Sequence, residues 1–217
     1  MAKRPVFAPD KKPPFVRELE VEFKWHPGLS RSQAQKSIAE LHHSANQHGL
    51  ENLLEISSKS STPLGNNLSA FHLMLKDQAG QQMSVECAYQ GSKVFEQGGP
   101  YTDLYQTSSR EARQDERLRT SGRIIAFEFQ GTRWPATPTT AFYDWLYLDA
   151  LKQHPELQQQ LLDFDGFTDI AFNPEKSAAC QARCAAMFVA LVRLGQFDET
   201  LRSQEAFLKR MQNQPEV

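Results

Sequence analysis

Alternating apolar and polar residues predict several short strands along this chain. From Phe15 to Trp25 apolar and charged side chains alternate at the period of a half-exposed strand. Shorter strand patterns run from Leu53 to Ser57 and from Phe71 to Lys76, and Ile124 to Phe129 has the clearest one. Residues 1–14 carry prolines among lysines, which argues against a helix or a central strand, so we expect an extended arm there.

Apolar residues that recur at three- and four-residue steps predict the helices. Ser30 can cap a helix that runs to Gln47, and another helix is expected from Met83 until the Gly98-Gly99-Pro100 stop. Further helices are predicted over residues 109–118, 140–152, 155–163 and 178–194. The connecting segments are a polar loop at 63–67, turns at 77–80 and 173–176, and a proline-containing connector at 134–140; residues 204–217 are polar and expected to fray.

Composition and length indicate one folded domain. The 217 residues are 40% hydrophobic and 23% charged, which is ordinary for a globular protein. The predicted fold is α+β and mainly helical, with a few short strands and an N-terminal extension. We expect residues 1–50 to form this extension, residues 51–197 the main domain, and residues 198–217 a C-terminal tail.

Charge and cysteine content exclude several classes of protein. A net charge of -2 argues against nucleic-acid binding through a global field, although local clusters of lysine and arginine remain near the N-terminus and around residues 110–123. The three cysteines have no disulfide or zinc spacing and suggest a reducing compartment. Because no segment has the pattern of a signal peptide or a membrane span, we expect a cytoplasmic protein with no membrane partner. No motif indicates a metal or a cofactor.

The segment from Ser84 to Phe95 holds the candidate chemistry. On a helix, Glu86, Tyr89, Gln90 and Lys93 fall on one face, with Glu86 and Lys93 about 10 Å apart along the axis. A glutamate can transfer a proton, and a buried lysine can attack a sugar aldehyde to form a Schiff base. Gln90 could orient a hydroxyl. Taken alone, a glutamate and a lysine on one helix are more typical of a solvated face.

These residues also resemble a known family. The pattern Glu86, Gln90 and Lys93 is similar to the signature helix of the NADAR family, whose members act on N-linked ribosyl and ADP-ribosyl groups. Upstream, Ile56 to Lys59 and Leu68 to Phe71 resemble the family's opening strand and loop, with Ala70 in place of an asparagine.

The similarity continues toward the C-terminus. Ala112-Arg113 and Gly122-Arg123 match family positions, residues 149–162 resemble its long helix pair, and Phe167 to Ile170 keep only the aspartate of a tryptophan-glycine-aspartate segment. The chain resembles in particular the NADAR proteins that accompany DarT-type toxins, which ADP-ribosylate guanine bases in DNA. The resemblance implies a NADAR-like catalytic domain over residues 51–197, an antitoxin function and a DarT-type toxin as partner.

The resemblance also implies roles for individual residues. Lys93 would take the ribose C1 as a Schiff base and Glu86 would assist proton transfer, with no cofactor and no metal. The residues expected to bind the substrate are Gln90, Tyr89, Ser58, Lys59, Ser69, Phe71, Asp169 and Arg113. For Ser58, Lys59 and Ser69 ordinary turn chemistry is an equal alternative, and for Arg113 a solvated face is an alternative.

Three functions remain open from the sequence. The first is an N-glycosidic hydrolase that removes ADP-ribose from guanine in DNA. The second is the same chemistry on a small ribosyl phosphate such as a ribosylamino phosphate, which the modest net charge fits slightly better. The third is a non-catalytic module that binds ADP-ribose or the toxin.

Overall fold

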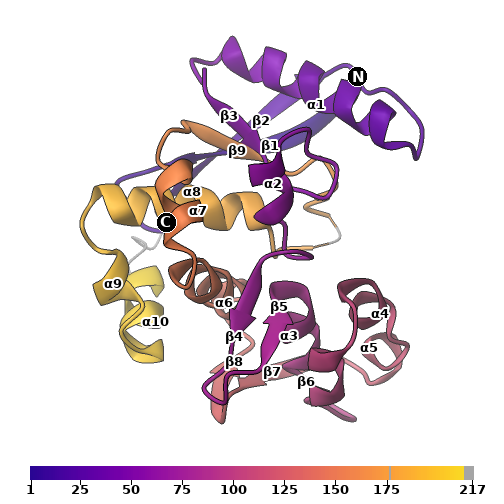
Figure 1. The fold of residues 1–217 in the computed structure, drawn as a ribbon, viewed down its shortest axis with the longest axis vertical. Coiled ribbons are helices and arrows are strands. Elements are labelled where there is room, and N and C mark those ends of the chain that lie inside the picture. Colours follow the sequence, from indigo (N-terminus) through magenta and orange to yellow (C-terminus); the bar gives the residue numbers. More distant parts are fainter. Residues whose placement is uncertain (176, 213–217) are drawn as a thin grey trace. The chain divides into compact units, whose positions relative to one another are not determined.

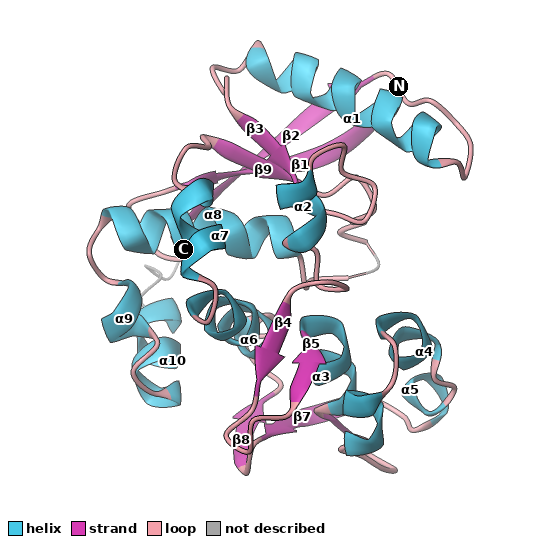
Figure 2. Cartoon of the chain, viewed as in Figure 1, coloured by secondary structure: helices cyan, strands magenta, loops and turns pink. Residues whose placement is uncertain are grey.

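The computed structural model describes residues 1–175 and 177–212 and shows a mixed α+β fold, as predicted (Figure 1). The chain divides into two compact units. Unit 1 comprises Met1–Ser69 and Pro155–Val217, and unit 2 comprises Ala70–His154. Figure 2 shows that both units contain helices and strands.

A four-stranded sheet forms the centre of unit 1. Its order is β2 (Val16–Phe23), β1 (Ala2–Pro9), β9 (Gly166–Thr168) and β3 (Leu53–Glu55). The first two strands are antiparallel, whereas β9 and β3 are parallel, with Leu53 opposite Gly166 and Glu55 opposite Thr168. The carboxyl ends of β3 and β9 therefore lie at the same edge.

Helices α1 (Arg31–Asn46) and α8 (Gln181–Arg193) pack against this sheet, on opposite faces in Figure 1. The core beneath α1 combines apolar residues of β1 and β2 with Ile38, Leu41 and Ala45. Ser30 caps α1 as predicted, its side chain accepting from the Gln33 backbone N–H. Packing on both faces explains why residues 5–8 of β1 are all buried.

The prediction of an extended arm over residues 1–14 was wrong, because β1 lies between two other strands. Its whole length pairs with β2, from Ala2 opposite Phe23 to Pro9 opposite Val16, but it meets β9 only at Phe7 opposite Phe167. A strand that is fully paired on one side alone can hold prolines, since a missing backbone N–H costs little where no neighbour needs it.

Three further predictions in unit 1 need correction. Residues 63–67 form the short helix α2 (Pro63–Asn67) rather than a loop, because the Thr62 side chain accepts from the Gly65 N–H and proline suits the first turn. The helix expected from residue 178 begins at Gln181. Residues 204–212 form α10 (Gln204–Gln212) with Phe207 fully buried, and they follow α9 (Phe197–Thr200).

Part of two predictions lies outside the described residues. The turn expected at 173–176 ends at Lys176, and the expected fraying extends over 213–217. The described part of the first shows a turn at Pro174 and Glu175. The predicted helix at 155–163 corresponds to α7 (Pro155–Leu161).

Unit 2 has a three-stranded antiparallel sheet and a separate hairpin. The sheet order is β6 (Lys93–Phe95), β7 (Ile124–Phe129) and β8 (Thr132–Pro135), and the hairpin pairs β4 (Met74–Lys76) with β5 (Gln82–Ser84). Its helices are α3 (Val85–Gly91), the 3-10 helix η1 (Thr102–Gln106), α4 (Ser109–Gln114), α5 (Arg117–Thr120) and α6 (Ala141–Lys152). An aromatic core of Phe127, Phe129, Trp134, Phe142 and Trp145 packs β7 and β8 against α6.

The strand predicted over 124–129 and the helix over 140–152 are confirmed. Two other predictions were wrong. The connector expected at 134–140 begins inside β8. The helix expected at 109–118 is divided at Asp115, because its extended ψ of 128° interrupts the helix and its carboxylate accepts from the Arg117 N–H.

Candidate functional site

The helix that carries Glu86 begins directly after the β4–β5 hairpin. Ser84 caps α3 by accepting from the Cys87 backbone N–H, and the Glu86 N–H donates to the carbonyl of Ala70. These contacts place Glu86 in the first turn, where its side chain is only 6% exposed. A carboxylate there is also favoured by the helix dipole.

The helix ends before Lys93, so the prediction that Glu86 and Lys93 share one helix face was wrong. A Cβ on Gly91 would lie 2.5 Å from the ring of Tyr105, so the glycine allows this ring to approach the end of the helix closely. Ser92 donates to the Ala88 carbonyl at 2.6 Å and closes the helix. Lys93 then begins β6, where it pairs with Phe127.

The side chains of Glu86, Gln90 and Lys93 are nevertheless connected. The Lys93 ammonium donates to Gln90 Oε1 at 2.6 Å, and Gln90 Nε2 donates to Glu86 Oε1 at 2.9 Å. A glutamine amide has one accepting and one donating end, so a single orientation serves both neighbours. We call these three residues the Glu-Gln-Lys chain.

Tyr89 lies beneath the lysine end of this chain. Lys93 Nζ is 4.6 Å from the centroid of the Tyr89 ring, which is within the range of a cation–π interaction. The ring stacks on Phe127 and Phe142 at centroid distances of 5.6 and 6.3 Å and meets the edge of Tyr143 at 4.9 Å. Burial raises the pKa of Tyr89, so its hydroxyl stays protonated.

The environment of Lys93 makes its ammonium unusually acidic. Burial lowers the pKa of Lys93 from 10.5 to about 8, Glu86 opposes this shift, and the positive charge of Arg113 adds to it. With a pKa of about 8, about one lysine in ten is neutral at pH 7, against about one in several thousand for an ordinary lysine. Lys93 can therefore act as a nucleophile near neutral pH.

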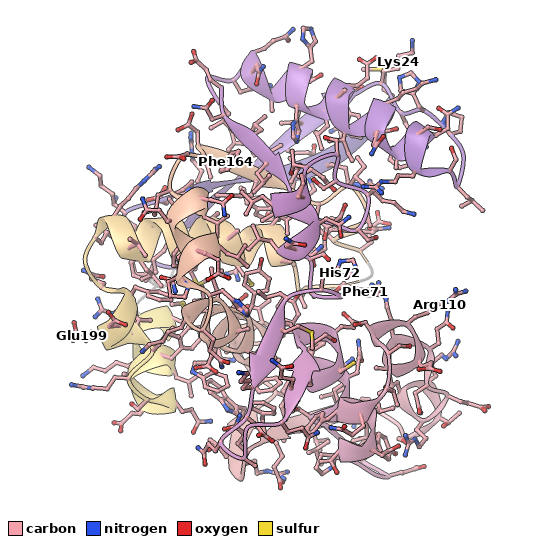
Figure 3. All side chains as sticks on the ribbon, in the orientation of Figure 1. Lys24, Phe71, His72, Arg110, Phe164 and Glu199 are labelled. Atoms are coloured by element: carbon pink, nitrogen blue, oxygen red, sulfur yellow. The ribbon has the colours of Figure 1, made fainter. Side chains whose placement is uncertain are left out.

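Two more predicted residues of unit 2, Phe71 and Arg113, contact each other. The Arg113 guanidinium lies 5.7 Å from the centroid of the Phe71 ring, and Ser109 donates to the Phe71 carbonyl at 2.9 Å. Arg113 is exposed, as is Arg110, which extends outward from α4 in Figure 3. These arginines supply positive charge on the same helix.

The local basic cluster predicted around residues 110–123 is partly neutralised. Arg117 forms ion pairs with Asp103 at 2.6 Å and with Asp115 at 2.9 Å. Arg123 pairs with Glu96 at 2.7 Å. Since those guanidinium groups already have carboxylate partners, they contribute little free charge toward a nucleic acid.

The other four predicted residues belong to unit 1. Ser58 and Lys59 follow β3, and Asp169 follows its parallel neighbour β9, so the structure brings these three to one sheet edge. Ser69 is buried and donates to the Asn66 carbonyl at 2.7 Å.

A buried carboxylate that the sequence prediction missed, Glu55, lies at the same edge. Its Oε1 accepts from Ser57 Oγ at 2.6 Å and from the Ile170 N–H at 2.9 Å, and its Oε2 accepts from Thr168 Oγ1 at 2.6 Å. Burial raises the pKa of Glu55, while these three hydrogen bonds oppose the shift. An acidic residue inside the apolar run Leu53 to Ile56 was the available signal.

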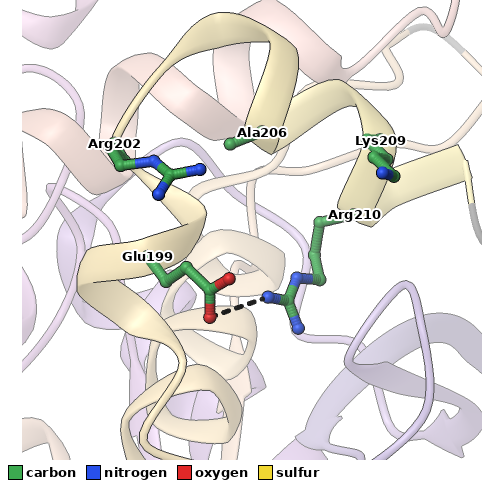
Figure 4. Close-up of a pocket in the computed structure, with 5 residues that line it drawn as sticks. All are labelled: Glu199, Arg202, Ala206, Lys209 and Arg210. Carbon is green, nitrogen blue, oxygen red and sulfur yellow. Dashed lines mark ion pairs between the residues drawn. The ribbon is translucent and has the colours of Figure 1, made fainter.

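A separate pocket of unit 1 contains none of the predicted residues. It has a volume of about 240 Å³ and is lined by Glu199, Arg202, Ala206, Lys209 and Arg210 (Figure 4). Glu199 and Arg210 form an ion pair across it at 3.4 Å. Because its one carboxylate is already paired, this pocket offers no counterpart to the Glu-Gln-Lys chain.

Fold and site together define an α+β protein in which a buried carboxylate is linked through a glutamine amide to a lysine with a lowered pKa. The family model described as DarT1-associated NADAR antitoxin matches residues 2–217. The chain therefore belongs to this antitoxin family, and the predicted resemblance is confirmed over both units. A search of curated proteins finds no match. Within residues 1–175 and 177–212, every helix is too short or too polar to cross a bilayer.

Proposed function

We propose that this protein is an N-glycosidic hydrolase that removes ADP-ribose from guanine bases of DNA and thereby counteracts a DarT-type toxin. The observation that carries the proposal is the Glu-Gln-Lys chain, in which a lysine with a pKa of about 8 is linked to a buried glutamate. A lysine whose pKa is lowered by burial is an activated nucleophile that can form a Schiff base with a carbonyl carbon. Membership of the antitoxin family supports the same conclusion.

The first chemical step is attack by the neutral Lys93 amine on C1 of the ribose. The Nζ–C1 bond forms as the bond between C1 and the guanine nitrogen breaks, and one amine proton passes by way of Glu86 to the departing nitrogen. The nitrogen lone pair then forms the C1=N bond while the ring C1–O4 bond opens and O4 takes a proton from solvent. The product of this step is a protonated Schiff base.

The second step is hydrolysis. Water adds to C1, a proton returns to solvent, and the C–N bond breaks to release ADP-ribose and the free Lys93 amine. The sum is one adduct and one water converted to guanine in DNA and ADP-ribose. Glu86 is suited to the proton transfer of the first step because Gln90 ties its carboxylate to the lysine.

The geometry changes the proposed tasks of two residues. Gln90 is engaged at both ends of its amide, so we assign it to alignment of Glu86 and Lys93 rather than to a substrate hydroxyl. Tyr89 lies under the Lys93 ammonium, so we assign it to support of the lysine. Phe71, Arg113, Ser58, Lys59, Ser69 and Asp169 remain proposed substrate-binding residues.

Reductive trapping tests this proposal directly. An oligonucleotide that carries ADP-ribosylated guanine is incubated with the native protein, Lys93→Ala and the control Lys76→Ala, which removes an exposed lysine of β4. The native protein and Lys76→Ala should release ADP-ribose, and cyanoborohydride should add it covalently at residue 93. Lys93→Ala should do neither, and an unchanged rate in that variant would refute the mechanism.

The same experiment separates the two alternative functions. Turnover of small ribosyl phosphates but not of the DNA adduct would move the substrate assignment to metabolites. Binding of ADP-ribose by the native protein and Lys93→Ala alike, with turnover by neither, would identify a binding module.

A further inference from the structure

We propose that Glu55 is the positioning residue that holds the loop after β3 and the segment after β9 together as one binding edge for the ADP-ribosyl part of the substrate. This inference rests on the proposed function, because it assigns Ser58, Lys59 and Asp169 to the same ligand. Glu55 itself is only 3% exposed and acts through its neighbours.

The topology places both segments at a favourable location. Strands β3 and β9 are parallel neighbours, and Glu55 and Thr168 are the last residues of each and lie opposite one another. Ligands of open sheets with parallel strands commonly bind outside the carboxyl ends of those strands. The next residues along the chain are Ile56 to Ser60 on one side and Asp169 to Ala171 on the other.

The Glu55 carboxylate joins the two segments through three hydrogen bonds. On the side of β3 it accepts from Ser57 Oγ, which in turn accepts from the Lys59 N–H at 3.1 Å. On the side of β9 it accepts from Thr168 Oγ1 and from the Ile170 N–H. A single side chain therefore holds Ser57, which precedes Lys59, together with Thr168 and Ile170 on either side of Asp169.

The direction of each hydrogen bond around Thr168 follows from donor counting. The Thr168 hydroxyl has one proton and donates it to Glu55, so the contact of 2.8 Å with His42 Nε2 requires the imidazole to donate. His42 can do so in its neutral form, since burial lowers its pKa to about 4. In this arrangement the two Glu55 oxygens accept from three donors, Ser57 Oγ, Thr168 Oγ1 and the Ile170 N–H.

A second clamp spans the same two segments. The Gln181 amide at the start of α8 donates to the Ile56 carbonyl at 2.6 Å and to Asp169 Oδ2 at 3.2 Å. Asp169 Oδ1 accepts from the Ala171 N–H at 3.0 Å. Burying a charge is costly unless it has partners, and the hydrogen bonds of Glu55 and Asp169 supply them within these two segments. The exposed Ser58 hydroxyl and the half-buried Lys59 remain available for phosphate or ribose oxygens.

Binding of free ADP-ribose to the full chain, measured by calorimetry, tests this role. Glu55→Gln keeps the shape but replaces one acceptor with a donor, and Ser57→Ala removes only the loop contact. Since a hydrogen bond to a charged group is worth about one factor of ten in affinity, we expect Glu55→Gln to bind ADP-ribose about tenfold more weakly. Ser57→Ala should show a smaller loss in the same direction.

A matched control uses Thr200→Val. Thr200 is fully buried in unit 1 and donates to the Gln196 carbonyl at 2.7 Å, but it takes no part in the Glu55 contacts. This variant should lose stability and keep its affinity for ADP-ribose. Equal affinity in native protein, Glu55→Gln and Ser57→Ala would overturn the inference, as would native protein that fails to bind ADP-ribose.

Turnover kinetics distinguish this inference from the proposed function. With the DNA adduct as substrate, Glu55→Gln should raise KM about tenfold and leave kcat near the native value, because the hydrogen bonds of Glu55 are made to Ser57, Thr168 and Ile170 and not to the Glu-Gln-Lys chain. A purely structural role would lower the amount of folded enzyme and hence the apparent kcat without changing KM. If the native protein binds ADP-ribose through Glu55 but shows no turnover, the proposed hydrolysis fails and the binding edge stands.

Discussion

Lys93 should make the stability of the protein depend on alkaline pH, and replacing it with methionine should remove that dependence. In the folded state its pKa is about 8, whereas in the unfolded chain it returns to about 10.5. Between these values the unfolded chain binds more protons than the folded protein. The free energy of unfolding therefore rises as the pH is raised through this window, and the full cost of the buried charge is present below pH 8.

The magnitude follows from the two pKa values. Raising the pH from 7 to 9.5 should recover about 1–2 kcal/mol of stability from this one group, after allowance for the solvent screening of a half-buried side chain. Methionine does not titrate, so the stability of Lys93→Met relative to the native protein should fall by that amount over the same range. Lys93→Met also loses the hydrogen bond to Gln90. This loss changes the free energy of unfolding of the variant equally at pH 7 and pH 9.5, so it cancels when the two pH values are compared.

Urea unfolding at pH 7 and pH 9.5 provides the measurement. The native protein, Lys93→Met and Lys76→Met are compared, the last of which removes an exposed lysine of the same unit. Lys76→Met should track the native protein at both pH values. If the difference in unfolding free energy between Lys93→Met and the native protein is the same at both pH values, the pKa of Lys93 is not lowered. The reasoning about its nucleophilicity is then wrong.

Three further predictions follow from the same contacts. The rate of hydrolysis should rise with pH and level off above about pH 8, the pKa of Lys93. Because Arg113 lowers this pKa, Arg113→Gln should move the rise to higher pH in a profile of rate against pH. A rise at lower pH in the variant would contradict this prediction. His42 has a pKa lowered to about 4, so stability should fall as the pH drops from 6.5 to 4, and His42→Gln should show a weaker fall in thermal unfolding. Gly91→Ala should destabilise the protein by about 1–3 kcal/mol in urea unfolding, since the new Cβ would lie 2.5 Å from the ring of Tyr105. An unchanged free energy of unfolding would mean that the Tyr105 ring moves freely.

The parts of the fold that the sequence predicts best are those with a clear period. Residues 31–46 and 124–129 form the expected helix and strand because caps and apolar spacing agree there. The strand at Ala2–Pro9 could not be predicted, since its prolines are tolerated only because β9 meets it at one residue. That pairing depends on a partner more than 150 residues away in the sequence.

The candidate site was predicted in composition but not in geometry. Glu86, Gln90 and Lys93 were identified as a group. The spacing of these residues predicted that Lys93 belongs to the same helix, but the helix ends at Gly91. At the end of this helix Ser92 donates to the Ala88 carbonyl and the ring of Tyr105 lies close to Gly91, and helix propensity does not reveal such a tertiary contact. Glu55 escaped notice for a related reason, because its three donors come from the loop after β3 and from residues 168–170.

The end of α3 at Gly91 explains how the side chains of Glu86 and Lys93 are linked through one residue. On a continuous helix the two charges would lie about 10 Å apart along the axis, and each would meet solvent separately. Because the chain turns into β6 at Lys93, the Gln90 amide reaches both side chains with hydrogen bonds of 2.6 and 2.9 Å. Burial lowers the lysine pKa, and the glutamate keeps it from falling further, so both protonation states of the amine are accessible near neutral pH. A nucleophile that must lose one proton and later regain it requires that balance.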